Sequence, residues 1–257
     1  MQKLGYSEYG RYMVHLPANG FADRGTVTQG GDIGYPVTRA LGLFYPQSCK
    51  ASHMNLAIPN PPVVTDKDIF FEVQQTPLTE AEKAGLARTK WFTTEGFGYN
   101  LIQATKPQTI GYSMADSPVG LLAWIYEKLH DWTDDYPWTD DEILTWVSVY
   151  WFSTPGPAAS QRLYYERSHD PENLRERLNG YVPDVKLGTA KFAKDLYLMP
   201  KAWNKTLGPL VMAKEYDQGG HFAAIERPDV IVKDLREMFG KNGGAYAIVQ
   251  GRTGFEE

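Results

Sequence analysis

The stretch Gly30-Gly31-Asp32-Ile33-Gly34 constrains the fold of this chain more than any other part of its sequence. Small residues two positions before and two positions after a nucleophile let a strand reverse sharply into a helix, which lifts the nucleophile above the sheet. Gly30 and Gly34 fill the small positions, and Asp32 stands at the position of the nucleophile. A carboxylate nucleophile forms an ester on the protein itself, which favours attack on carbon–oxygen or carbon–halogen bonds. The same residues are also typical of an ordinary glycine-rich turn, so the interpretation depends on the rest of the chain.

The residues around Asp32 predict a strand, a helix and a second strand. Val27–Gln29 leads into the turn as a strand, and Tyr35–Leu41 has the pattern of the helix that leaves it. Pro36 fits the first helical turn, where its missing N–H costs nothing. Ala51–Leu56 is predicted to be the next strand. The order strand, helix, strand is typical of a parallel sheet.

Composition excludes several classes of function. The 257 residues are 42% hydrophobic, which is enough for a buried core, and the net charge of -5 with no basic run argues against binding to nucleic acid. No apolar run approaches the roughly 20 residues that span a bilayer, and Met1–Tyr6 lacks the apolar core of a signal peptide. The single cysteine, Cys49, offers neither an internal disulfide nor a metal cluster. We therefore expect a cytoplasmic chain with no membrane segment.

Three regions differ in pattern, and we expect them to be three parts of one protein. Residues 1–58 alternate short apolar runs with glycine-rich turns, and the proline-rich hinge Ile58–Pro62 closes this part. Residues 59–178 are predicted to be mostly helical, and residues 179–257 return to alternation. The two outer regions are expected to form one α/β core, with the nucleophile turn in the first and the acid and base in the last. The middle region is expected to be a helical lid inserted between them.

Local patterns predict individual elements within these regions. The segment Thr79–Ala84 is expected to begin one helix. Capping residues indicate further helix starts at Ser117 and Thr139, the last as part of the capping box Thr139–Glu142. The last region is expected to hold two short strands, at Val182–Gly188 and Leu210–Ala213, and one amphipathic helix at Ile231–Phe239.

An ester on Asp32 needs a base that activates water for its hydrolysis. Of the five histidines, His221 is the candidate, because it comes last in the chain and lies in a glycine-bearing turn, Asp217–Phe222, after the final strand. The other histidines are expected to have surface, capping or core roles: His15, His53, His130 and His169.

The base also needs an orienting carboxylate, which is expected between Asp32 and His221 in chain order. Asp195 is favoured because it follows a predicted strand, whereas the competitor Asp184 precedes the apolar residues of that strand and falls at the wrong end. Opening a strained ring also needs a proton donor to the oxygen. Tyrosine, with a pKa of about 10, suits this role, but the chain has 16 tyrosines and composition does not choose among them.

Several segments resemble the epoxide hydrolases of the α/β-hydrolase superfamily, in the branch of the microsomal and fungal enzymes. They occur in family order: Gln29–Gly34, Gly98–Leu121, Ser160–Glu166 and Gly219–Glu226. The resemblance covers nearly everything from Gln29 to about Lys241. It implies an α/β-hydrolase core, here the C-terminal half of a mostly parallel sheet, with an inserted helical lid.

The resemblance also implies a reaction and a set of site residues. A small apolar epoxide and water would give a vicinal diol through a covalent ester, with no metal or organic cofactor. The implied residues are the nucleophile Asp32, the ring-opening tyrosines Tyr99 and Tyr164, the base His221, its orienting acid Asp195, and the backbone N–H of Ile33 as an oxyanion donor.

The chain departs from the family pattern in two ways. The family has strands and a His-Gly-x-Pro loop before the elbow, and this chain has neither, which predicts an N-terminal truncation. Losing the oxyanion donor of that loop costs about 100- to 1000-fold in rate, and the unpaired sheet edge favours homo-oligomerisation. The stretch His15–Thr26 reads as an insertion between Arg11–Val14 and the elbow. A retained intron or a misdrawn gene model is our hypothesis for both departures.

Other functions stay open at this point. Missing strands favour a catalytically inactive or impaired remnant of an epoxide hydrolase. A haloalkane dehalogenase also uses an aspartate nucleophile but would not need Tyr99 and Tyr164, and a serine esterase is disfavoured because Asp32 occupies the elbow. The family contains membrane-anchored and soluble members, so association with a membrane through a preceding segment also stays open.

Overall fold

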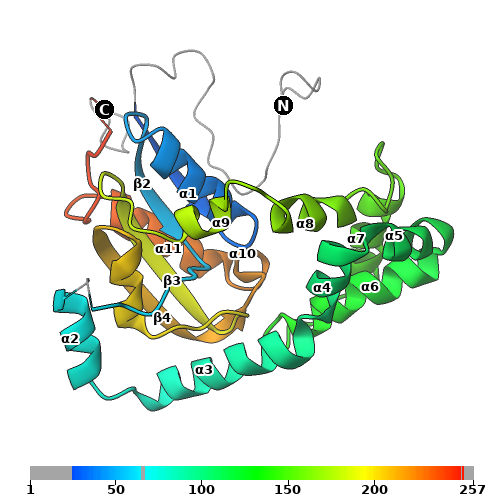
Figure 1. The fold of residues 1–257 in the computed structure, drawn as a ribbon, viewed down its shortest axis with the longest axis horizontal. Coiled ribbons are helices and arrows are strands. Elements are labelled where there is room, and N and C mark those ends of the chain that lie inside the picture. Colours follow the sequence, from blue (N-terminus) through cyan, green and yellow to red (C-terminus); the bar gives the residue numbers. More distant parts are fainter. Residues whose placement is uncertain (1–24, 65–66, 250, 252–257) are drawn as a thin grey trace.

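The computed structural model describes residues 25–64, 67–249 and 251 (Figure 1). Its described part contains a four-stranded sheet in the order β1-β2-β3-β4, in which all neighbouring strands are parallel. The strands are β1 (Thr26–Gly30), β2 (Cys49–Met54), β3 (Lys186–Lys194) and β4 (Leu210–Gly220). The predicted parallel α/β class is therefore confirmed. Within the described residues β1 is the outermost strand on its side of the sheet.

Helices cover both faces of this sheet. On one face, α1 (Gly34–Phe44) packs through Tyr35 against Met54 and Leu187. On the other face, α11 (Pro228–Phe239) packs through Ile231 against Phe192. Leu187 and Phe192 belong to the same strand and serve opposite faces, because successive side chains of a strand alternate in direction. The helices expected to follow the elbow and to close the chain are both confirmed.

A run of helices separates β2 from β3, as the sequence predicts for the middle region. These are α2 (Lys67–Gln75), α3 (Glu80–Trp91), α4 (Gly98–Thr105), α5 (Pro107–Asp116), α6 (Pro118–Asp131), α7 (Asp140–Trp151), α8 (Gln161–Ser168) and α9 (Leu174–Leu178). A π-helical turn, Phe92–Gly96, joins α3 to α4, and the 3-10 helix Lys201–Leu207 and the short α10 (Ala223–Glu226) lie later in the chain. In Figure 1, helices α4 to α8 gather beside the sheet, and α3 runs from the sheet to this group.

The predicted helix starts are confirmed with their capping contacts. The Thr79 and Thr139 hydroxyls accept hydrogen bonds from the backbone N–H groups three residues on, at 3.1 and 3.3 Å, and both form full capping boxes. The Ser117 hydroxyl accepts from the N–H of Gly120 at 3.0 Å. Each such cap is worth about 1 kcal/mol. The N-terminal ends of α3, α6 and α7 are therefore set by local sequence.

Two strand predictions in the last region are wrong in their bounds. The strand expected at Val182–Gly188 begins only at Lys186 and runs on to Lys194. The strand expected at Leu210–Ala213 extends to Gly220, so the predicted turn at Asp217–Gly220 is a strand. The reason is pairing, because β3 and β4 stay paired as far as Lys194 and Gly220. A shift in register between Phe192 and Lys194 accommodates extra residues of β4 before Gly220.

The predicted insertion lies almost entirely outside the described residues. Arg11–Val14 and residues 15–24 are not described, and Thr26, at the end of the predicted insertion, is the first residue of β1. None of the helices in the described part of the chain combines the length and the apolar character needed to cross a bilayer.

Candidate active site

Asp32 lies in a tight turn between β1 and α1. Its backbone φ is +46°, in the left-handed region that side-chain-bearing residues rarely adopt, and such strain is typical of functional positions. The turn brings backbone close to backbone, since a Cβ at Gly30 would lie 2.6 Å from the carbonyl oxygen of Gly34. A Cβ at Gly31 would lie 2.5 Å from the side chain of Asn55. A Cβ at Gly34 would meet nothing within 4 Å, so the expectation that this position must be small is wrong.

Contacts between neighbouring strands hold the turn in place. The Gln29 amide donates to the Asn55 side-chain oxygen at 2.7 Å, and the Asn55 N–H donates to the carbonyl of Gly30 at 3.2 Å. Gln29 is the last residue but one of β1, and Asn55 directly follows β2. The end of β1, and with it Asp32, is therefore fixed against the end of β2.

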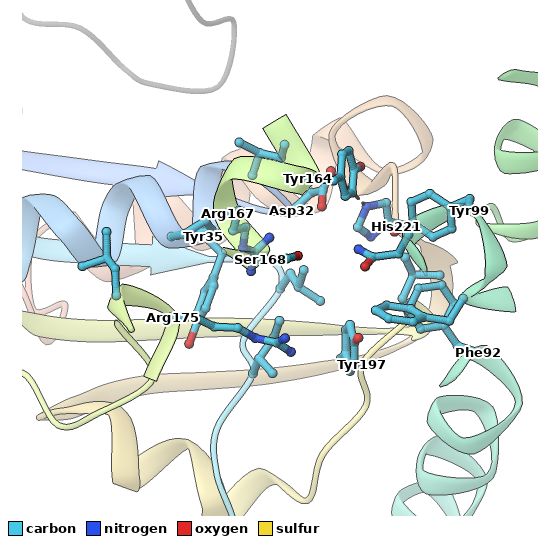
Figure 2. A pocket seen from close by; sticks show the side chains of 18 of the residues that line it. Asp32, Tyr35, Phe92, Tyr99, Tyr164, Arg167, Ser168, Arg175, Tyr197 and His221 are labelled. Carbon is cyan, nitrogen blue, oxygen red and sulfur yellow. Dashed lines mark ion pairs between the residues drawn. The ribbon is translucent and has the colours of Figure 1, made fainter. Parts of the chain in front are cut away.

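Asp195 and His221 come to the same edge of the sheet as Asp32. Asp195 directly follows β3 and His221 directly follows β4, and the carboxyl ends of parallel strands share one edge. The imidazole Nδ1 of His221 lies 2.7 Å from Asp195 Oδ1, and its Nε2 lies 3.8 Å from Asp32 Oδ2. Asp195 Oδ1 also accepts from the N–H of Leu196 at 2.7 Å. Figure 2 shows the His221 ring beside Asp32, on the side towards Tyr99.

The two carboxylates make His221 a strong base. Burial acts to lower the pKa of His221, but the charges and hydrogen bonds of Asp195 and Asp32 outweigh it and raise the pKa to about 10. Burial likewise acts to raise the pKa of Asp32, and His221 together with the backbone N–H of Ile33 leaves it below its ordinary value. At neutral pH the resting site therefore holds an ionised Asp32 beside an imidazolium.

Two tyrosines face Asp32 from the helices. Tyr99 lies on α4 and Tyr164 on α8, and their rings meet edge to face with centroids 5.9 Å apart. Burial is the largest cause that raises the pKa of both phenols, and the charge of Asp32 adds to it. The pKa of Tyr164 rises to about 12, and that of Tyr99 rises further. Both phenols therefore stay protonated and can donate hydrogen bonds into the site.

Trp132 links the helices to His221 and was not singled out from the sequence. The N–H of His221 donates to the carbonyl of Trp132 at 2.7 Å, and the Trp132 ring contacts the rings of His221 and Tyr99, with centroids 5.2 and 5.1 Å apart. One residue, Phe97, separates the π-helical turn Phe92–Gly96 from α4, the helix that carries Tyr99. Such turns are often found at functional sites. Only the aromatic bias of this part of the sequence hinted at Trp132.

An acidic pair that the sequence also left unassigned holds the segment before His221. The Glu226 carboxylate accepts from the N–H groups of Gly220 and Asp134, at 3.0 and 2.7 Å. The Asp134 carboxylate accepts from the N–H of Gly219 at 2.8 Å. These contacts join the end of β4 to the loop after α6, so the helical region helps to fix the position of His221.

Two cavities meet at Asp32. The first, which we call the arginine cavity, has a volume of about 300 Å³ and is lined in part by Arg167, Arg175 and Tyr197. The second, which we call the tryptophan cavity, has a volume of about 200 Å³ and is lined mostly by apolar side chains, among them Trp124, Trp132 and Trp146. The lining residues that the cavities share are Asp32, Ile33, Tyr99 and Tyr164.

The other residues considered from the sequence lie away from this junction or outside the described chain. Asp184 is exposed and precedes β3, as expected of the weaker candidate. His53 is buried in β2, and His130 and His169 are exposed at the ends of α6 and α8. His15 lies outside the described residues. In the described part of the chain, no group of three or more histidine, cysteine or acidic side chains could hold a metal ion.

Comparison with known proteins gives no matching family model but several similar proteins. A protein of Stigmatella aurantiaca, provisionally named an epoxide hydrolase, is 37% identical over 245 residues, which are 93% of this chain and 48% of the relative. The structure of Aspergillus niger epoxide hydrolase is 37% identical with a TM-score of 0.67, and the match covers 84% of this chain and 52% of that one. Juvenile hormone epoxide hydrolase from the silkworm Bombyx mori is 31% identical with a TM-score of 0.70, over 84% of this chain and 54% of that one.

The sheet, its order and these structural matches define the α/β-hydrolase fold. The chain belongs to the epoxide hydrolase family, in the branch of the microsomal and fungal enzymes. It spans about half the length of the curated relatives that it matches.

Proposed function

We propose that this site hydrolyses an epoxide to a vicinal diol through a covalent ester on Asp32. The observation that supports the proposal is the line of contacts from Asp195 through His221 to Asp32, which ends where Tyr99 and Tyr164 face the same cavities. A carboxylate nucleophile, an oriented base and two protonated phenols are the groups that this reaction needs. We further propose that residues 59–178 act as a lid over a core formed by residues 1–58 and 179–257.

In the first step, Asp32 attacks a ring carbon of the epoxide. A bond forms between the carboxylate oxygen and this carbon, and the bond from the carbon to the ring oxygen breaks. The ring oxygen leaves as a developing alkoxide and takes a proton from one of the two phenols, Tyr99 or Tyr164, while the other donates a hydrogen bond. The pKa of each phenol is raised, so both are protonated before the step begins.

In the second step, water hydrolyses the ester. Esterification removes the negative charge of Asp32, which is one cause of the raised pKa of His221. The imidazole can then lose its proton, and the phenolate formed in the first step is a base that can take it up. Neutral His221, oriented by Asp195, draws a proton from water as the water attacks the ester carbonyl carbon of Asp32. The backbone N–H of Ile33 stabilises the tetrahedral oxyanion that results. As this oxyanion collapses, the bond between the carbonyl carbon and the ester oxygen breaks, and the leaving oxygen takes the proton of the new carboxyl group. The diol leaves, and the site returns to an ionised Asp32 beside an imidazolium.

Oxygen labelling in a single turnover tests the ester directly. With enzyme in excess over styrene oxide in heavy-oxygen water, the first diol should carry an unlabelled oxygen that came from Asp32. Asp32→Ala should abolish turnover. Labelled diol in the first turnover would contradict the ester mechanism, and turnover by the Asp32→Ala variant would exclude Asp32 as the nucleophile.

A catalytically impaired chain is the second candidate. One observation favours it: within the described residues β1, which leads into the turn with Asp32, is the outermost strand of the sheet, so a neighbouring strand supports it on one side only. The two candidates differ in a simple experiment on the purified chain. A cooperative melting transition together with turnover supports the active enzyme, whereas a folded chain without turnover supports the impaired one.

A further inference from the structure

Arg167 and Arg175 bring two guanidinium groups to the arginine cavity, and the proposed reaction does not use either of them. Arg167 follows Tyr164 on α8, and Arg175 lies on α9. Figure 2 shows both side chains at the wall of the cavity away from Tyr99 and Phe92. No ion pair or hydrogen bond joins either guanidinium to another residue of the described part of the chain. Their donors are therefore free to meet a ligand.

Nearby arginines on the same segments do have partners. Arg177, also on α9, stacks over the ring of Phe44 at 5.1 Å, and Arg162, also on α8, donates to the Gln108 side chain at 3.1 Å. The contrast separates Arg167 and Arg175 from arginines that serve packing. It also supplies a matched control on the helix that carries Arg175.

Apart from Asp32, the acidic residue that lines the arginine cavity is Asp170, and it does not pair with the two arginines. The Asp170 carboxylate lines the same cavity but accepts from the backbone N–H groups of Glu172 and Leu174, at 3.1 and 2.9 Å. It therefore serves the turn that starts α9. Arg167 acts electrostatically on Asp32, but this is the smallest of the influences that lower the pKa of Asp32.

The tryptophan cavity differs in character. Its one lysine among the lining residues, Lys128, lies over the rings of Trp124 and Tyr99 at 4.0 and 5.2 Å, and its ammonium is paired with Glu127 at 2.8 Å. The positive charge of Lys128 in the tryptophan cavity is thus already balanced by Glu127. The rest of the wall is mostly aromatic and aliphatic, which suits a hydrocarbon group.

We propose that the substrate is an epoxide with a carboxylate on one side of its ring and an apolar chain on the other. This inference rests on the proposed function and names the substrate class of the same site. The ring sits where the cavities meet, beside Asp32, with the apolar chain in the tryptophan cavity. The carboxylate reaches Arg167 and Arg175, whose planar fork of N–H donors matches a carboxylate better than any neutral group.

Binding of the reaction product tests the inference without requiring turnover. The probe is a medium-chain dihydroxy fatty acid with the vicinal diol in mid-chain, compared with its methyl ester by titration calorimetry at low salt. The acid should bind about tenfold more tightly than the ester, because charge-assisted hydrogen bonds are involved. Arg167→Gln and Arg175→Gln should each reduce this preference, and the double variant should abolish it. The control Arg177→Gln removes the same charge from α9 and should keep the preference.

The outcomes separate this inference from the proposed function. Equal binding of acid and ester, or no binding of either, overturns the inference. A preference that survives in the double variant but disappears in Lys128→Gln places the anion in the tryptophan cavity and also overturns it. Hydrolysis of styrene oxide depends only on the proposed function. Its absence beside an intact binding preference contradicts the reaction but not the arginine-cavity assignment.

Discussion

The charge on His221 predicts how the stability of the fold depends on pH. In the native state the buried imidazole has a pKa of about 10, compared with an ordinary value of 6.5, because Asp195 and Asp32 outweigh the effect of its burial. A group whose pKa is raised on folding stabilises the protein fully below its unfolded pKa. This stabilisation is lost as the pH rises towards the folded pKa. We therefore expect the contribution of His221 to the free energy of unfolding to fall between pH 6.5 and pH 10.

The size of the effect follows from the shift. One pKa unit corresponds to about 1.4 kcal/mol, so within this window the slope approaches 1.4 kcal/mol per pH unit. Across the whole window the loss is roughly 4 to 5 kcal/mol. Asp32→Asn removes one of the two carboxylates that hold the proton. This substitution should lower the folded pKa of His221 and so narrow the pH range over which stability is lost. The 2.7 Å contact between His221 and Asp195 should stay in place.

The assay is urea unfolding at a series of pH values from 6 to 10.5, on the wild type and on His221→Gln. Subtracting the two curves removes the titration of exposed lysines and tyrosines that both proteins share. Nitrogen NMR of labelled histidine reads the imidazole directly, and the signal that is missing in His221→Gln identifies the residue. A flat difference curve together with a neutral imidazole at pH 8 would refute the reasoning.

Three further predictions concern the phenols, a buried arginine and a helix cap. Tyr99→Phe and Tyr164→Phe should each slow ester formation, and the double variant should form the ester about 100-fold more slowly or worse. Mass spectrometry of the Asp32-containing peptide measures this rate. A double variant that forms the ester as fast as the wild type contradicts the role of the phenols. Arg39→Met should destabilise the fold by about 3 kcal/mol in urea unfolding, because its buried guanidinium serves three backbone carbonyls that would lose their donor. Thr139→Ala should lower the free energy of unfolding by about 1 kcal/mol, because the capping box is lost. Thr145→Ala on the same helix should lower it less. Equal losses of stability in the two variants would exclude the cap as the cause.

What the sequence predicts well is local or fixed by chain order. The caps at Ser117 and Thr139 depend on residues three positions apart, so no knowledge of the fold is needed to find them. The meeting of Asp195 and His221 depends only on each following a strand of one parallel sheet. The carboxyl ends of both strands were predicted several residues too early, yet the two ends still come to one edge.

What the sequence misses depends on contacts between distant segments. Gly219 and Gly220 have the composition of a turn, but pairing with β3 keeps them in β4, and Asp134 holds the N–H of Gly219 from a loop far away in sequence. No local rule joins Asp134 to that strand. Similarly, the arginines of α8 and α9 have the composition of a solvated surface. Only the packing of these helices turns Arg167 and Arg175 towards a cavity.

The two cationic groups of the arginine cavity also bear on the base step. In the proposed reaction His221 loses a proton after the ester forms, and any additional negative charge near the imidazole would raise its pKa and oppose that loss. A bare substrate carboxylate beside the site would replace the charge that esterification of Asp32 has just removed. Held between the guanidiniums of Arg167 and Arg175, the same carboxylate adds little net field at the imidazole. The arginines would thus serve both to bind an acidic epoxide and to let His221 act as a base while that substrate is bound.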